Sequence, residues 1–157
     1  GYDLAWLQTF DEMLPDYLAG FGLQANYTYN DSVSGEKDDK GNEKPFRGLS
    51  KNQTNLVAFY EHNGFEARIA YNSRSGYYAW DNWSNIGGKS VAEALHNNAT
   101  SWMDLGLSYD INDNFTVRAD VANLQDKIDT RYLGHPSHIQ YAATYGRRFS
   151  VGVRAKY

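Results

Sequence analysis

The sequence predicts an all-β chain in which about seven antiparallel strands form a segment of a transmembrane β-barrel. Three observations support this fold class. Apolar and polar residues alternate with a period of two in seven segments, the connections between these segments are alternately short and long, and the 157 residues include 13 Tyr, 7 Phe and 4 Trp. Tyr and Trp concentrate at membrane interfaces. The negative mean hydropathy is compatible with a barrel, because barrel strands carry a much weaker apolar signal than membrane helices.

The first four segments have the pattern of strands with one apolar and one polar face. They are Tyr2 to Phe10, Phe21 to Asn30, Asn52 to Glu61 and Phe65 to Asn72. Tyr2 to Phe10 is the weakest, because Leu7 falls on its polar face. The predicted apolar faces hold Leu4 and Trp6; Leu23, Ala25, Tyr27 and Tyr29; Leu56, Ala58 and Tyr60; and Phe65, Ala67, Ile69 and Tyr71.

The last three segments, Trp102 to Asp110, Phe115 to Ala122 and Arg147 to Tyr157, alternate most regularly. Their predicted apolar faces hold Met103, Leu105, Leu107 and Tyr109; Phe115, Val117, Ala119 and Val121; and Phe149, Val151, Val153, Ala155 and Tyr157. The faces opposite are polar, charged or small. In an outer-membrane barrel the apolar side chains face lipid and the polar ones face a wet lumen.

The connections alternate in length along the chain. The short ones are Met13 to Gly20, His62 to Gly64 and Asn112 to Asn114, and the long polar ones are Asp31 to Lys51, Ser73 to Ser101 and Lys127 to Gly146. Short periplasmic turns and long extracellular loops are the layout of outer-membrane barrels. Seven strands are too few to close, since bacterial barrels have an even number from 8 upward. We therefore expect residues 1–157 to be the C-terminal part of a larger barrel.

Several short motifs, in order along the chain, resemble TonB-dependent outer-membrane receptors. These are Ala25-Asn-Tyr-Thr-Tyr29, Leu49-Ser-Lys51 followed by Asn55, Phe65-Glu-Ala-Arg-Ile-Ala-Tyr71, Ala122-Asn-Leu-Gln-Asp126, and Gly146-Arg-Arg-Phe149 with the end at Tyr157. The resemblance covers essentially the whole chain and places it on the last seven strands of that family. The residues of these motifs are similar to those of a proteobacterial branch of the family that is associated with carbohydrate uptake.

This resemblance implies a 22-stranded barrel in the outer membrane of a Gram-negative bacterium. It implies that an N-terminal plug domain closes the barrel and that the receptor imports scarce ligands with energy from the TonB complex. The plug, the TonB box and the earlier strands are absent from these residues. The family also implies contact with outer-membrane lipid, and recognition of Val153, Ala155 and Tyr157 by the barrel-assembly machinery.

Two long connections carry candidate ligand-binding residues. The first has four aromatic rings within seven residues, together with a carboxylate: Tyr77, Tyr78, Trp80, Asp81 and Trp83. This combination would suit an oligosaccharide. The alternative is an interfacial aromatic girdle with internal loop packing. In the last loop Arg131 could hold an anion bidentately, and His135 with His138 could face a metal chelate. Generic loop polarity is the alternative there.

Charged residues form two further groups. Asp104, Arg118, Asp120, Arg148 and Arg154, with Asp110, are predicted to lie on the lumen side, where they could pair across strands and tie the wall to the plug. The segment from Asp31 to Lys51 is rich in both signs, from Glu36 to Lys44, and is predicted to be a solvated loop.

The sequence gives little support to other classes of function. The basic residues are scattered at a net charge of −4, which argues against a nucleic-acid partner. There is no recognisable nucleophile motif and no phosphate-binding loop, so we expect no enzyme activity, no cofactor and no resident metal. The alternatives left open are a metal-chelate receptor of the same fold, an enzyme on a smaller outer-membrane barrel, and a soluble carbohydrate-binding β-sandwich.

Overall fold

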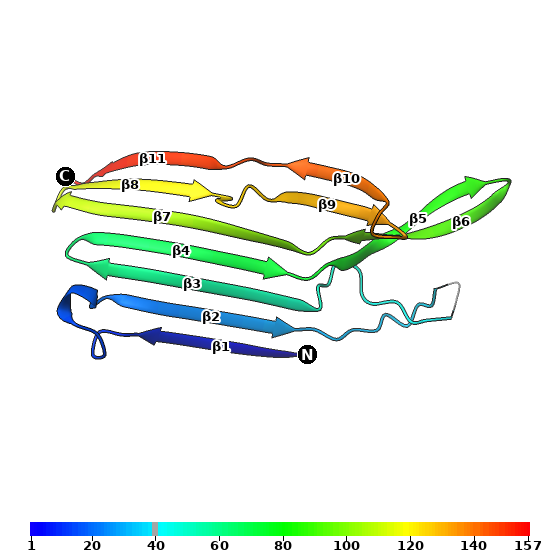
Figure 1. The fold of residues 1–157 in the computed structure, drawn as a ribbon, viewed down its shortest axis with the longest axis horizontal. Coiled ribbons are helices and arrows are strands. Elements are labelled where there is room, and N and C mark those ends of the chain that lie inside the picture. The colour runs from blue at the N-terminus through cyan, green and yellow to red at the C-terminus, as the bar shows by residue number, and fades with distance from the viewer. Residues whose placement is uncertain (39–40) are drawn as a thin grey trace.

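The computed structural model describes residues 1–38 and 41–157, without the side chain of Ile86, and contains two antiparallel sheets (Figure 1). The larger sheet has seven strands in the order β1-β2-β3-β4-β7-β8-β11. Their bounds are β1 Tyr2–Thr9, β2 Phe21–Tyr29, β3 Asn52–His62, β4 Phe65–Arg74, β7 Thr100–Asn112, β8 Phe115–Ala122 and β11 Arg148–Ala155. All seven predicted strands are confirmed, and the fold class with them. None of the helices in the described residues has the length and hydrophobicity to cross a membrane.

The short and long connections lie at opposite ends of the seven-stranded sheet, as predicted (Figure 1). The β1–β2 link with its 3₁₀ turn η1 (Asp16–Leu18), the β3–β4 turn and the β7–β8 turn share the end where the C-terminus lies. The β3–β4 turn is tight because Asn63 and Gly64 both have positive φ, 50° and 77°. These two residue types adopt that conformation at little cost. The chain starts at the other end, beside the long connections.

The strand register joins the seven apolar faces into one continuous surface, which we call the apolar belt. One row across it runs Leu23, Ala58, Ile69, Leu105, Val121 and Phe149, each the direct partner of the next. The neighbouring rows continue the pattern with Ala25, Leu56 and Tyr71 on one side, and Tyr60, Ala67 and Leu107 on the other. Most of its large side chains are exposed in these residues, among them Leu56, Ile69, Leu107, Phe149, Val151 and Val153.

The opposite face of β3 is partly apolar, and local packing explains why. Val57 lies opposite Ala70 and is buried, with 4% of its surface exposed. Phe59 lies opposite Gly22, and a Cβ on Gly22 would collide with the Phe59 ring. The absent side chain therefore makes room for an aromatic ring on the polar face.

A second sheet, which the sequence did not predict, extends the wall beyond the long-connection end. It has the order β10-β9-β6-β5, with β5 Tyr77–Ile86, β6 Lys89–Asn97, β9 Ile128–Leu133 and β10 Ile139–Thr144. The prediction that Ser73 to Ser101 and Lys127 to Gly146 are loops is therefore wrong, because each segment contains a β-hairpin. The β9–β10 hairpin continues the β8 and β11 pair, and the β5–β6 hairpin projects farthest from the larger sheet (Figure 1).

Two edges remain open in the seven-stranded sheet, at β1 and at β11. β11 ends at Ala155, two residues before the predicted strand end, although Lys156 N still donates to Asn114 O at 2.8 Å. Tyr157 lies beyond the strand and is fully exposed.

The third long connection, 31–51, has no strand in its described part. An isolated bridge joins Lys37 and Glu43, and two backbone hydrogen bonds, Ser34 N to Lys44 O and Lys44 N to Glu36 O, hold its two arms together. Asp39 and Lys40, which belong to the predicted charged loop, lie outside the described residues.

Candidate functional site

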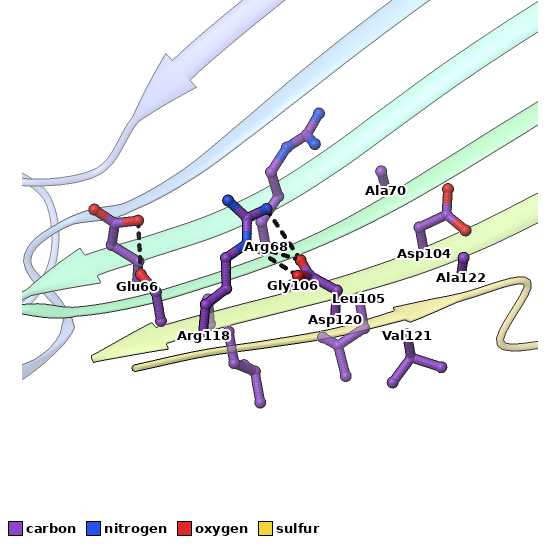
Figure 2. A pocket seen from close by; sticks show the side chains of 13 residues that line it. Glu66, Arg68, Ala70, Asp104, Leu105, Gly106, Arg118, Asp120, Val121 and Ala122 are labelled. Carbon is purple, nitrogen blue, oxygen red and sulfur yellow. Dashed lines mark hydrogen bonds and ion pairs between the residues drawn. The ribbon is translucent and has the colours of Figure 1, made fainter. Parts of the chain in front are cut away.

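The polar face of the seven-stranded sheet carries a group of charged side chains near the short turns. We call Glu66, Arg68, Asp104, Arg118 and Asp120 the charged cluster; they line one depression of about 340 Å³. Figure 2 shows Arg68, Arg118 and Asp120 projecting to the same side of the sheet, whereas Leu105 and Val121 project to the other. The register explains this grouping, because Arg118 pairs with Ser108 and Ser108 pairs with Glu66.

Hydrogen bonds organise the charged cluster. Arg118 Nε donates to both carboxylate oxygens of Asp120 at 3.0 Å, and Ser108 Oγ donates to Glu66 Oε2 at 3.0 Å. Gly106 lies beneath Asp120, and a Cβ there would be 3.2 Å from Asp120 Oδ1. The cluster holds charges of both signs in defined positions and can bind a polar protein surface through charge-assisted hydrogen bonds.

Asp104 has a structural partner at the end of β8. Its Oδ1 accepts a 2.9 Å hydrogen bond from the backbone N–H of Asn123, a buried residue with φ of 57°. The Asn123 side chain in turn donates to Gly146 O and accepts from Lys127 N. Asn123 therefore fixes the point where the β8–β11 pair gives way to the β9–β10 pair.

The structure brings together only part of the predicted lumen-side group. Asp104, Arg118 and Asp120 share the depression of Figure 2. Arg148 lines a neighbouring depression with Asp104, and Arg154 lies farther down β11 opposite Thr116. The sequence prediction missed Glu66, Arg68 and Ser108. Their alternation along the polar faces of β4 and β7 was the available signal.

The predicted aromatic group lies on β5, where the strand separates its rings. Trp80 pairs with Leu95 and Trp83 with Ala92, so the two indoles lie on opposite faces of the hairpin. Their exposed fractions are 45% and 66%, whereas Tyr78 is 4% exposed. The Tyr77 ring contacts the Arg74 guanidinium at 4.3 Å from its centroid. Trp80 and Trp83 therefore cannot form one stacking platform.

An aromatic row crosses the second sheet, from β5 through β6 to β9. His96 stacks on Tyr132 with 5.0 Å between ring centroids, and Tyr78 lies 5.9 Å from His96 on the other side. Burial lowers the pKa of His96, and the nearby Asp81 carboxylate opposes this only in part. The imidazole is therefore held in its neutral form between two phenol rings.

Asp81 anchors the connection 31–51 to β5. Lys44 Nζ lies 2.6 Å from Asp81 Oδ2, with both side chains mostly covered, and Gly48 N donates to Tyr78 O at 2.8 Å. Burial acts to raise the pKa of Asp81, but the Lys44 hydrogen bond and the neighbouring Tyr78 hydroxyl and Arg47 guanidinium outweigh it, so the net shift is downward. The carboxylate is thus charged at neutral pH and holds the loop in place.

The last predicted group lies at the β9–β10 hairpin. Arg131 stacks over the Tyr141 ring at 4.9 Å, and the rings of His135 and His138 lie 6.0 Å apart. His135 Nδ1 is 2.9 Å from Ser137 Oγ. Within residues 1–38 and 41–157, no group of three or more His, Cys, Asp or Glu side chains is arranged to hold a metal ion.

The three residues expected to guide assembly lie at the open edge. Val153 projects from β11 into the apolar belt, Ala155 is the last residue of that strand, and Tyr157 follows it.

Comparison with known proteins gives one result. The family model described as "TonB dependent receptor-like, beta-barrel" matches residues 1–124. The match covers the first six strands of the larger sheet and the β5–β6 hairpin. Neither the curated proteins nor the solved structures contain a match.

Proposed function

The chain belongs to the TonB-dependent receptor-like β-barrel family, and from this premise we propose that it forms part of the barrel wall of an outer-membrane active transporter. In this role it is a component of a transporter and not an enzyme. Its strands separate lipid on one side from a polar import path on the other.

The apolar belt is the observation that carries this proposal. It crosses the strands of the larger sheet in register and remains exposed, while the opposite face carries charged and amide side chains. A soluble sandwich would cover such a belt with a second sheet. The second sheet here instead extends the wall beyond the strand ends and does not cover the belt (Figure 1).

The open edges at β1 and β11 support a barrel with more strands. Unpaired backbone N–H and C=O groups cannot face hydrocarbon, so each edge requires a further strand. In the family this barrel has 22 strands, and the charged cluster then faces a plug domain. We propose that the cluster holds the plug through hydrogen bonds that can break when TonB pulls on it.

We place the segment in the outer membrane of a Gram-negative bacterium, with the β5–β6 hairpin outside the cell. Val153, Ala155 and Tyr157 then lie at the periplasmic end, where the assembly machinery would bind them. In this orientation a ligand first reaches Trp80, Asp81 and Trp83 on β5, Arg131 on β9, and His135 in the β9–β10 turn. An oligosaccharide suits exposed indoles beside carboxylate and amide groups.

Uptake by cells that carry the complete gene tests this function. Cells expressing the receptor should accumulate its ligand, and the accumulation should stop when the TonB protein is deleted or the proton gradient is collapsed. A receptor without its plug domain is the matched control for passive leakage. Uptake that is indifferent to TonB, or a receptor found in the soluble fraction, would contradict the proposal.

A further inference from the structure

The polar face has a second region, at the opposite end from the charged cluster, and its chemistry is different. Asn26, Asn55 and Asn72 are direct cross-strand partners on β2, β3 and β4, and Asn72 is the partner of Trp102 on β7. We call the three Asn residues, together with Trp102 at their end, the amide row. It lies toward the long connections, whereas the charged cluster lies toward the short turns.

The amide row lines an open depression. This depression has a volume of about 480 Å³ and also contains Thr28, Gln53, Arg74, Thr100 and Asp129. A second depression of about 370 Å³ adjoins it, and the two share Trp102 and Asp129. The Tyr145 ring lines the second depression, with its centroid 5.7 Å from that of Trp102. Together they form a groove with an aromatic pair at its centre.

The amides retain their hydrogen-bonding capacity. Each Asn side chain offers two donors and two acceptor lone pairs. Among the residues that the structure describes, none of the three Asn side chains forms a hydrogen bond, and Asn55 Oδ1 is shielded from solvent without a partner. Buried polar atoms in folded proteins are normally satisfied, so this acceptor lacks the partner it needs within the wall. A ligand in the groove can supply that partner once the Asn55 side chain turns toward it.

The charges of the groove nearly cancel, which excludes a strongly ionic ligand. The larger depression of the groove contains two charged residues, Arg74 and Asp129. The Arg74 guanidinium packs over the Tyr77 ring, 4.3 Å from the ring centroid. Directly opposed residues on neighbouring strands lie about 5 Å apart. The row thus presents a donor–acceptor pair at intervals comparable to one sugar ring, next to an indole that can pack on the apolar face of such a ring.

We propose that the amide row, with Tyr145 and Asp129, is a binding subsite for a neutral polyhydroxylated ligand, namely a stretch of oligosaccharide. The proposal rests on the import function proposed above and names its substrate class. The outer end of the polar face selects the ligand by amide hydrogen bonds and indole stacking. Asp104 lines the smaller depression of the groove as well, and the other four members of the charged cluster have no part in this recognition.

The test uses the complete receptor, purified in detergent. An array of immobilised neutral and acidic glycans identifies a binding glycan, and calorimetry with that glycan then measures the affinity of each variant. Trp102→Leu should weaken binding by about tenfold or more, as truncation of a central aromatic contact does, and Asn55→Ala by a smaller factor. Trp102→Tyr should keep most of the affinity, and this variant is informative if Trp102→Leu does not fold.

Two controls make the result specific. Trp6→Leu is matched to Trp102→Leu but lies on the apolar belt, where Trp6 pairs with Ala25, and it should leave the affinity unchanged. Gln24→Ala, on the polar face outside the groove and opposite Leu7 and Val57, should also leave it unchanged. Loss of affinity in either control to the same extent as in Trp102→Leu would overturn the assignment.

Other outcomes separate this inference from the import function. Wild-type affinity in Trp102→Leu, with a lowered melting temperature, would show that the groove packs against the plug and would overturn the subsite. Binding of acidic glycans or an anionic iron chelate alone would overturn the ligand class while TonB-dependent uptake stands. Trp102-dependent glycan binding without TonB-dependent uptake would support the subsite and overturn the transport role.

Discussion

Ile69 on β4 gives the sharpest measure of whether the apolar belt faces lipid. On the belt face of this strand Ile69 lies between two aromatic residues, Phe65 and Tyr71. A strand rises about 3.4 Å per residue, and barrel strands tilt by about 40°. Phe65 and Tyr71 are therefore separated by about 16 Å along the membrane normal, and Ile69 lies within about 3 Å of the midpoint between them.

This depth sets the expected cost of a charge. An Arg on the lipid face costs about 2–4 kcal/mol at the bilayer midplane and about 0–1 kcal/mol near an interface. We therefore expect Ile69→Arg to lower the free energy of unfolding by about 3 kcal/mol, a factor of more than 100 in the folding equilibrium. Phe65→Arg, on the same strand and face, should cost about 1 kcal/mol beyond the loss of the ring contacts.

Gln24→Arg is the control for charge alone. Gln24 lies on the polar face at a similar level, and its cross-strand partners Leu7 and Val57 carry no charge. Its replacement should change stability by no more than about 0.5 kcal/mol. The assay is guanidinium unfolding of the complete receptor in phospholipid vesicles. Equal costs for Ile69→Arg and Gln24→Arg would refute a lipid-facing belt.

Three further predictions concern the wall outside the lipid. Asn123→Ala should lower the free energy of unfolding by about 2–4 kcal/mol, because hydrogen bonds to Gly146 and from Lys127 are lost at a φ of 57°, and Asn123→Gly should cost less because glycine adopts this φ freely. The Asp81 pKa is lowered in the folded state, so its ion pair with Lys44 stabilises the protein fully above about pH 4 and is lost as the pH falls through the lowered pKa. Hydrogen exchange in 31–38 and 41–51 should thus rise at pH 3, and Asp81→Asn should raise it already at pH 7. The His96 pKa is also lowered, so the stability contributed by the neutral ring is complete above about pH 6.5 and lost below it. Exchange in β6, corrected for intrinsic rates, should rise between pH 6.5 and 5 in the wild type and not in His96→Phe.

The strands of the larger sheet could be predicted because most of them keep one apolar and one polar face along their length. Met103, Leu105, Leu107 and Tyr109 alternate with polar or small residues without a break along β7, as expected of a strand in the lipid-facing wall that we propose. The strands of the second sheet do not need to keep one face apolar along their whole length. In β5 a register shift at Ala79 interrupts the alternation between Tyr78 and Trp80. A bulge of this kind makes a strand look like an irregular loop in the sequence.

The site residues were predictable only in part, for a related reason. Asp104, Arg118 and Asp120 are visible as charges on the polar faces of two consecutive strands. Their grouping with Glu66 and Arg68 depends on the pairing of β4 with β7, which are separated by the unpredicted β5–β6 hairpin. Trp102 joins the amide row through the same pairing, whereas its three Asn residues are aligned by the pairing of β3 with β2 and β4. Cross-strand register, and not residue type, decides which side chains meet.

The nested hairpins of this wall also set an order of folding events. Most neighbouring pairs in the larger sheet are joined through a turn or through a smaller hairpin that brings the two strands together, as β5–β6 does for β4 and β7. The exception is the pair β2 and β3, which the long connection 31–51 joins. Closing such short loops costs little entropy, so these pairings form early and quickly. The free edge of β11 has no local partner, and in the larger barrel that we propose it pairs with a strand far away in the sequence. Sealing the cylinder is then the slow, final step, and the rate at which β11 finds that strand limits how fast the receptor matures.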